Sequence, residues 1–107
     1  DWPLYALMIA IAVIGAPFVE ELFFRGLLLR SLIPLTGPVV AIGLQAAVFA
    51  SMHLKPSYGL GNVAVFGAIG VMGVVQGVIA ERYRRLGPAM FSHGLFNSVA
   101  VLALVFR

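Results

Sequence analysis

The most informative polar residues of this chain are two adjacent glutamates, Glu20 and Glu21, with Arg25 four residues after the second. They end an apolar stretch that begins at Leu4. Ionisable groups inside a membrane-length hydrophobic helix are costly and usually serve a function. The i,i+4 spacing of Glu21 and Arg25 predicts an intrahelical salt bridge. Glu20 points about 100° away from that pair, so we expect it to face a cavity as a general base.

The two histidines of the chain lie on other apolar segments, His53 four residues after Phe49 and His93 four residues before Asn97. Helical rise along a hairpin returns His53 to about the depth of Glu20, so we expect these two side chains to hold one water molecule. His93 reaches that depth only if its helix pair is displaced along the membrane normal. His93 and Asn97 offer two donors that can stabilise an oxyanion formed at a peptide carbonyl. Together these residues indicate hydrolysis of a peptide bond within a membrane.

The composition is that of a membrane protein. Of the 107 residues, 62% are hydrophobic and only 10% charged, and the mean hydropathy is +1.06. Soluble domains are about 45–50% apolar and roughly 25% charged. We therefore predict an all-α fold, a polytopic transmembrane bundle with about four membrane helices. The apolar segments are Leu4–Val19 continuing through Leu22–Leu29, Pro38–Met52, Val63–Ala80 and Pro88–Phe106.

The charged residues favour one orientation in the membrane. The net charge of +3 comes mostly from arginines near short connectors, a pattern that does not indicate nucleic-acid binding. The positive-inside rule predicts that the 31–37 and 81–87 loops are cytoplasmic. One side then carries Arg30, Arg82, Arg84 and Arg85, and the other carries Asp1, Lys55 and Arg107.

Small and amide side chains have a simpler interpretation. Gly73 and Gly77 follow the small-xxx-small pattern, which indicates close helix packing more strongly than room for a substrate. We assign Gln45, Gln76 and Asn62 to hydrogen bonding between helices.

Three alternatives to a metal-independent protease remain open. Glu20, His53 and His93 are a candidate set of zinc ligands, although a His-Glu-x-x-His motif is absent. No cofactor is expected, and a divalent metal such as zinc ranks second. A non-enzymatic immunity or scaffold protein would keep the same fold and bind a partner. Buried Glu and His side chains also occur in proton-relay and transport proteins.

The ordered motifs Glu20–Arg25, Phe49–His53 and His93–Asn97 resemble those of the CPBP family, which comprises type II CAAX prenyl endopeptidases and Abi bacteriocin-processing or immunity proteins. The resemblance implies a helical intramembrane endopeptidase in which Glu20 activates water and His53 helps to bind it. It also implies that His93 and Asn97 form the oxyanion site. Glu21, Arg25 and Phe49 would then support the motif helices.

The resemblance also sets expectations for the chain as a whole. We expect residues 1–107 to form one catalytic membrane domain, as part of a longer polypeptide. The implied partners are a peptide or lipidated protein substrate, which includes prenylated CAAX-type proteins, and membrane lipid. The Ala-, Val- and Gly-rich composition favours a bacterial plasma membrane. The sequence does not specify an oligomeric state.

Overall fold

The computed structural model describes residues 1–106, so the sidedness prediction for Arg107 lies outside the described residues. One continuous helix runs from Trp2 to Thr36 and begins at Asp1, whose side chain accepts a hydrogen bond from the Leu4 N–H. Two of its segments have wider, π-helical turns. Its parts are α1 Trp2–Ala10, the π-helical segment Ile11–Gly15, α2 Ala16–Glu21, the π-helical segment Leu22–Leu29 and α3 Arg30–Thr36.

Three further helices complete the fold and confirm the prediction of an all-α membrane bundle. The first helix, α5 and α6 are each long and apolar enough to cross a membrane, whereas α4 has only 14 residues. Many large apolar side chains are exposed on these helices, as expected for surfaces that face lipid. The bounds are α4 Pro38–Ser51, α5 Gly61–Tyr83 and α6 Gly87–Val105, with a short 3₁₀ turn at Pro56–Tyr58.

Both loops predicted to be cytoplasmic are shorter than the sequence suggested. The predicted 31–37 loop is helical through Thr36, and only Gly37 breaks the helix, with a φ of 84° that favours glycine. Helix α5 likewise continues to Tyr83 and ends where Arg84 adopts a left-handed φ of 57°. Pro34 and the charged residues Glu81 and Arg82 were expected to lie in loops, but they are part of the last turns of these helices.

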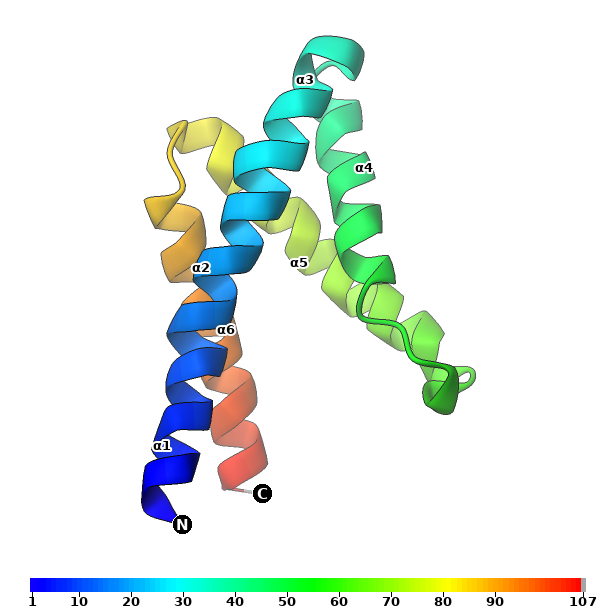
Figure 1. Cartoon of the computed structure of the whole chain (residues 1–107). Coiled ribbons are helices and arrows are strands. Elements are labelled where there is room, and N and C mark those ends of the chain that lie inside the picture. Colours follow the sequence, from blue (N-terminus) through cyan, green and yellow to red (C-terminus); the bar gives the residue numbers. More distant parts are fainter. Residues whose placement is uncertain (107) are drawn as a thin grey trace.

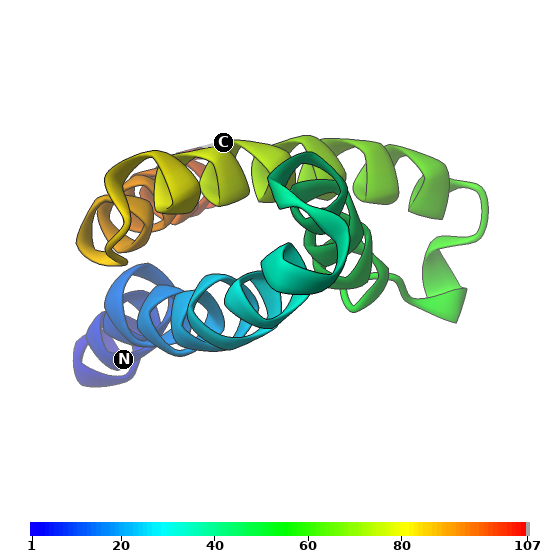
Figure 2. The same ribbon diagram turned by 90° about the horizontal axis from the view of Figure 1, so that it is seen from above.

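Helices α4 and α5 form a closely packed antiparallel hairpin, and α6 packs along the N-terminal half of the first helix (Figures 1 and 2). Two glycines of α5 allow its close approach to α4. A Cβ atom added to Gly73 would lie 3.0 Å from Ala46 Cα, and one added to Gly77 would lie 2.6 Å from Gln45 Nε2. These distances confirm that the glycines serve tight helix packing.

The turn between α5 and α6 lies lower than the turn between α3 and α4 in the view of Figure 1. This offset is the displacement that the sequence required for His93 to reach the glutamates. Buried Gln76 joins the two helices below the turn, because its Nε2 donates to the Ala89 carbonyl over 2.5 Å. The offset places the first turns of α6 beside α2.

Candidate active site

A fully buried ion pair forms the centre of the site. Arg25 NH1 lies 2.6 Å from Glu21 Oε2, and neither side chain is exposed. The two residues are one helical turn apart, so the predicted salt bridge is confirmed. A buried pair of this kind fixes both side chains, because separating them would leave an uncompensated charge.

His93 lies between the two adjacent carboxylates. Its Nδ1 is 2.8 Å from Glu21 Oε2, and its Nε2 is 3.3 Å from Glu20 Oε1. The Nδ1–H donates to Glu21, and Nε2 then faces Glu20. Since α6 supplies the histidine and α2 supplies both glutamates, this contact joins the first and last helices at the site.

The two glutamates differ in their access to solvent or substrate. The Glu20 side chain is 32% exposed, whereas that of Glu21 is fully buried and bonds both Arg25 and His93 through one oxygen. Glu21 therefore serves to hold Arg25 and His93 in place. Glu20 keeps a carboxylate oxygen that can reach a water molecule.

Arg25 is also held from the α4–α5 hairpin. Its NH2 donates to the Gly73 carbonyl over 3.3 Å, and the Gln45 Nε2 donates to the same oxygen over 2.9 Å. The Arg25 guanidinium carbon lies 4.4 Å from the centroid of the Phe49 ring, a cation–π geometry. These contacts fix the cation that neutralises Glu21.

The prediction that Gln45 bonds one helix to another is confirmed, because its Nε2 on α4 donates to the Gly73 carbonyl on α5. The sequence did not show that this completely buried side chain shares its acceptor with Arg25. A signal was present, because Gln45, Phe49 and His53 are spaced by four residues, which puts Gln45 and Phe49 on one face of α4 and His53 in the turn just after it.

The Phe49 ring contacts both histidines of the chain. Its ring centroid lies 4.8 Å from that of His53 and 5.9 Å from that of His93, and both contacts are edge-on. The Phe24 ring packs against it at 4.9 Å, in an apolar cluster that includes Met72. Phe49 thus packs against both histidines, and its role in supporting catalysis stays a prediction.

His53 is close to this cluster but does not bond to it. Its Nδ1 lies 2.8 Å from the carbonyl oxygen of Phe49, four residues earlier in the chain, which leaves Nε2 available. Within residues 1–106, no hydrogen bond or ion pair joins His53 to Glu20 or His93. The half-buried ring instead lines a cavity of about 410 Å³ together with Tyr58, Gly61, Val65 and Ile69.

Asn97 binds the first helix rather than the glutamates. Its Nδ2 donates to the Ala12 carbonyl over 2.8 Å. Pro17 has no N–H to give to the preceding wide turns, so a carbonyl in this region is free to accept a bond from outside. Gly94 lets α6 approach here, since a Cβ atom added to it would lie 2.9 Å from the Val13 oxygen. One amide N–H of Asn97 remains for other partners.

The proposed zinc alternative does not fit this arrangement. Among the described residues, no three His, Cys, Asp or Glu side chains are placed to hold a metal ion together. Both nitrogens of His93 face carboxylates, and His53 is bonded elsewhere. Glu20, His53 and His93 therefore do not form a ligand set in this conformation.

A protein-family model described as "Type II CAAX prenyl endopeptidase Rce1-like" matches residues 2–99. The match covers all of the polar residues of the candidate active site. No curated protein and no solved structure is significantly similar to the chain.

Proposed function

The chain belongs to the Rce1-like type II CAAX prenyl endopeptidase family, and on that premise we propose that Glu20 activates the water that hydrolyses the substrate's peptide bond. The family is one of CAAX-type intramembrane endopeptidases, and the three long apolar helices make the chain an integral membrane protein. The observation that carries the proposal is the contrast between the partly exposed Glu20 and the buried Glu21, both held by His93.

The proposed reaction begins with proton transfer from water to the Glu20 carboxylate. The resulting hydroxide attacks the peptide carbonyl carbon, and the carbonyl oxygen becomes an oxyanion. When the C–N bond breaks, Glu20 returns the proton to the leaving amine. Glu21 orients His93 throughout, in the way that a carboxylate orients a catalytic imidazole.

Two donors are candidates for the oxyanion. A doubly protonated His93 can keep its Nδ1–H on Glu21 while its Nε2–H turns from Glu20 to the developing charge. The free amide hydrogen of Asn97 is the second candidate, and its bond to Ala12 fixes the direction of the amide. We assign His53 to water or substrate binding through its unbonded Nε2.

The substrate that we propose is a peptide segment that is embedded in the membrane or anchored by a lipid, such as a prenylated CAAX-type protein. No resident cofactor is proposed. Membrane lipid surrounds the bundle, and we place the protein in a bacterial plasma membrane. Arg30 lies on the helix that leads into the α3–α4 turn, and Arg82, Arg84 and Arg85 lie at the α5–α6 turn, which supports a cytoplasmic position for both turns.

Cysteine labelling tests the orientation. Residues 1–107 contain no cysteine, so single cysteines at Arg85 and Lys55 report the two sides without background from this domain. A membrane-impermeant maleimide added to intact cells should label the Lys55→Cys protein and not the Arg85→Cys protein. The reverse pattern would invert the proposed orientation.

A cleavage assay tests the proposed function. The protein in detergent or liposomes is given a quenched fluorescent peptide that carries a prenylated cysteine motif. Glu20→Gln should abolish cleavage, and the matched carboxyl-to-amide control Asp1→Asn, at the exposed helix start, should retain it. Wild-type cleavage should survive a strong chelator. Full activity of Glu20→Gln would remove Glu20 from the role of base, and loss of cleavage with the chelator would return a metal to the mechanism.

A further inference from the structure

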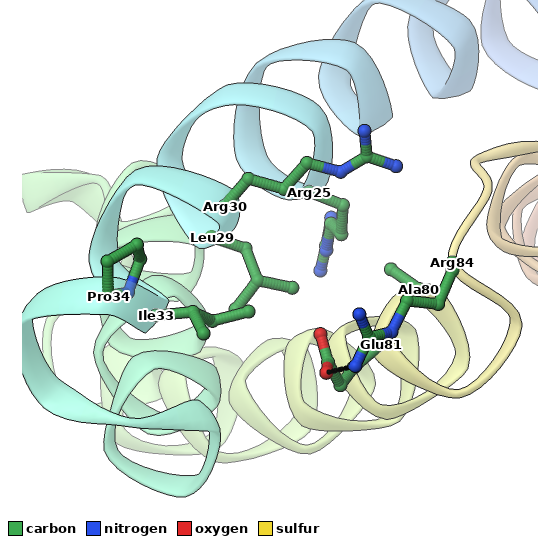
Figure 3. A pocket seen from close by; sticks show the side chains of 8 residues that line it. All are labelled: Arg25, Leu29, Arg30, Ile33, Pro34, Ala80, Glu81 and Arg84. Atoms are coloured by element: carbon green, nitrogen blue, oxygen red, sulfur yellow. Dashed lines mark ion pairs between the residues drawn. The ribbon is translucent and has the colours of Figure 1, made fainter.

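Helix α5 borders a cavity at each of its ends. At its C-terminal end a cavity of about 330 Å³ is lined by the exposed Arg30 and Arg84, and Figure 3 shows Arg84 in an ion pair with Glu81. At its start lies the cavity of about 410 Å³ whose wall includes a candidate catalytic residue, His53. The start of α5 therefore deserves the closer comparison with the proposed chemistry, because whatever holds this wall also holds His53.

His53 lies beyond the end of a helix. Helix α4 ends at Ser51, and the His53 N–H donates to the Ala50 carbonyl, three residues earlier, over 3.1 Å. A bond of this 3₁₀ type has poorer geometry than an α-helical bond, and the ends of helices fray. The position of His53 therefore depends also on what holds the chain that follows it.

Asn62 holds that chain. It is the second residue of α5, and its side-chain amide bonds both backbone groups of Lys55. The Lys55 N–H donates to Asn62 Oδ1 over 3.1 Å, and Asn62 Nδ2 donates to the Lys55 carbonyl over 2.8 Å. Two residues on paired strands exchange bonds in the same way. The expectation that Asn62 bonds one helix to another was wrong, because its partner lies in the loop between α4 and α5.

Lys55 connects Asn62 to two residues of the cavity wall. It follows His53 by two residues, so their Cα atoms are at most about 7 Å apart. Its carbonyl also accepts the Tyr58 N–H over 3.0 Å, and Tyr58 lines the same cavity. Within residues 1–106, no other side-chain hydrogen bond joins residues 52–60 to α5.

The opposite wall of the cavity is α5 itself. Gly61, Val65 and Ile69 line it at intervals of four residues, which places them on one face of the helix. The bonds of Asn62 thus fix the loop wall, with His53 and Tyr58, relative to the helix wall.

We propose that Asn62 is a positioning residue for His53. Its two hydrogen bonds to Lys55 hold the turn that carries His53 against the start of α5, and so keep the His53 ring in the place where it binds water or substrate. The inference rests on the proposed function, because it takes His53 as part of the reacting site.

Nuclear magnetic resonance tests the structural step without requiring cleavage. The whole protein, labelled with ¹³C in its histidine rings, is studied in detergent micelles, and signals are assigned with His53→Gln and His93→Gln. In Asn62→Ala the His53 signal should shift and broaden, because the turn becomes mobile on a microsecond to millisecond timescale. The His93 signal should stay unchanged, because Glu20 and Glu21 hold that ring.

Kinetics tests whether this position matters to the reaction. Asn62→Ala should lower kcat/KM for the fluorescent peptide about tenfold, the effect expected for two lost hydrogen bonds. Val63→Ala is the matched control, because Val63 is the next residue of α5 and is 75% exposed. It should leave both kcat/KM and the His53 signal unchanged.

A conservative variant separates positioning from stability. Asn62→Asp keeps an oxygen that can accept the Lys55 N–H but loses the donor to the Lys55 carbonyl. Its negative charge is favourable in the first turn of α5, so its unfolding temperature should not fall below that of the wild type. It should nevertheless lower kcat/KM about threefold, as expected for one lost bond, and shift the His53 signal less than Asn62→Ala does.

The two measurements separate the role of Asn62 from the proposed function. An unchanged His53 signal in Asn62→Ala overturns the inference, and so do equal changes of the His53 and His93 signals, which would show a general loss of structure. Equal kcat/KM values for Asn62→Ala and Val63→Ala also overturn it. Wild-type cleavage with an unchanged His53 signal would reject the role of Asn62 and leave the proposed function standing. A selective change at His53 without any wild-type cleavage would uphold the link between Asn62 and His53 and reject the proposed hydrolysis.

Discussion

Arg25 and Gln45 donate hydrogen bonds to one backbone oxygen, that of Gly73, from two different helices. The carbonyl belongs to α5, Gln45 belongs to α4, and Arg25 belongs to the first helix. This shared acceptor joins the α4–α5 hairpin to the Glu21–His93–Glu20 network, together with the contacts of Phe49. A displacement of α4 would thus move Arg25 and, through the Arg25–Glu21 ion pair, would shift His93 and Glu20.

The first prediction concerns Gln45. Gln45→Leu should lower kcat about tenfold with little change in KM, since a lost hydrogen bond next to a charged group costs about 1.5 kcal/mol. Gln76→Leu is the matched control, because Gln76 is equally buried but bonds Ala89 and not the Arg25 network. Both variants should lower the unfolding temperature. An equal fall in kcat for the two variants would mean that Gln45 acts only through stability.

The second prediction separates the two glutamates. Glu21→Gln should lower the free energy of unfolding by about 3–5 kcal/mol, because it leaves the buried Arg25 charge unpaired. Glu20→Gln removes a partly exposed group and should change stability by less than about 1 kcal/mol. Chemical denaturation in mixed micelles measures both values.

A double variant tests the origin of the Glu21 effect. Glu21→Gln combined with Arg25→Met should recover part of the lost stability, since removal of both charges eliminates the unpaired one. Strictly additive losses would show that the ion pair is not the cause.

The helical fold was predictable from the sequence because lipid exposure leaves long apolar segments, and a spanning segment must satisfy its backbone bonds internally. The ends of the helices were less predictable. Thr36 and Tyr83 extend their helices beyond the predicted bounds, because a single left-handed residue at Gly37 or Arg84 is enough to end a helix. Such endings depend on one dihedral angle and leave little trace in composition.

The site was predictable only within each helix. The i,i+4 rule correctly paired Glu21 with Arg25, whereas the contact of His93 with both glutamates depends on the offset between the helix pairs. The interhelical bond of Gln45 was predicted correctly, but the acceptor that it shares with Arg25 was not, because that carbonyl belongs to a third helix. The catalytic roles of Glu20, His53, His93 and Asn97 stay predictions.

The close packing of α4 on α5 supports a prediction at Gly77. Gly77→Ala would place a Cβ atom 2.6 Å from Gln45 Nε2 and should destabilise the protein by about 1–3 kcal/mol. Gly67→Ala is the matched control on the same helix, because nothing lies within 4 Å of its added Cβ atom. It should be neutral or slightly stabilising, since alanine is the better helix former. Equal unfolding temperatures for Gly77→Ala and Gly67→Ala would contradict the packing argument.

The last prediction distinguishes two roles of Asn97. If its free amide hydrogen stabilises the oxyanion, Asn97→Ala should lower kcat about 10²–10³-fold, the usual effect of one lost oxyanion donor. If Asn97 only anchors α6 to Ala12, the loss should appear as about 1 kcal/mol of stability with a much smaller change in kcat.

The roles are resolved by measuring kcat and the unfolding free energy on the same preparations. Ser98→Ala is the control, because within residues 1–106 the Ser98 side chain bonds only the Gly94 carbonyl of its own helix. We expect a fall in kcat of at least about 10²-fold for Asn97→Ala and none for Ser98→Ala. If the fall in kcat of Asn97→Ala is explained by its loss of stability alone, Asn97 is not an oxyanion donor. His93 would then be the remaining side-chain donor to the oxyanion.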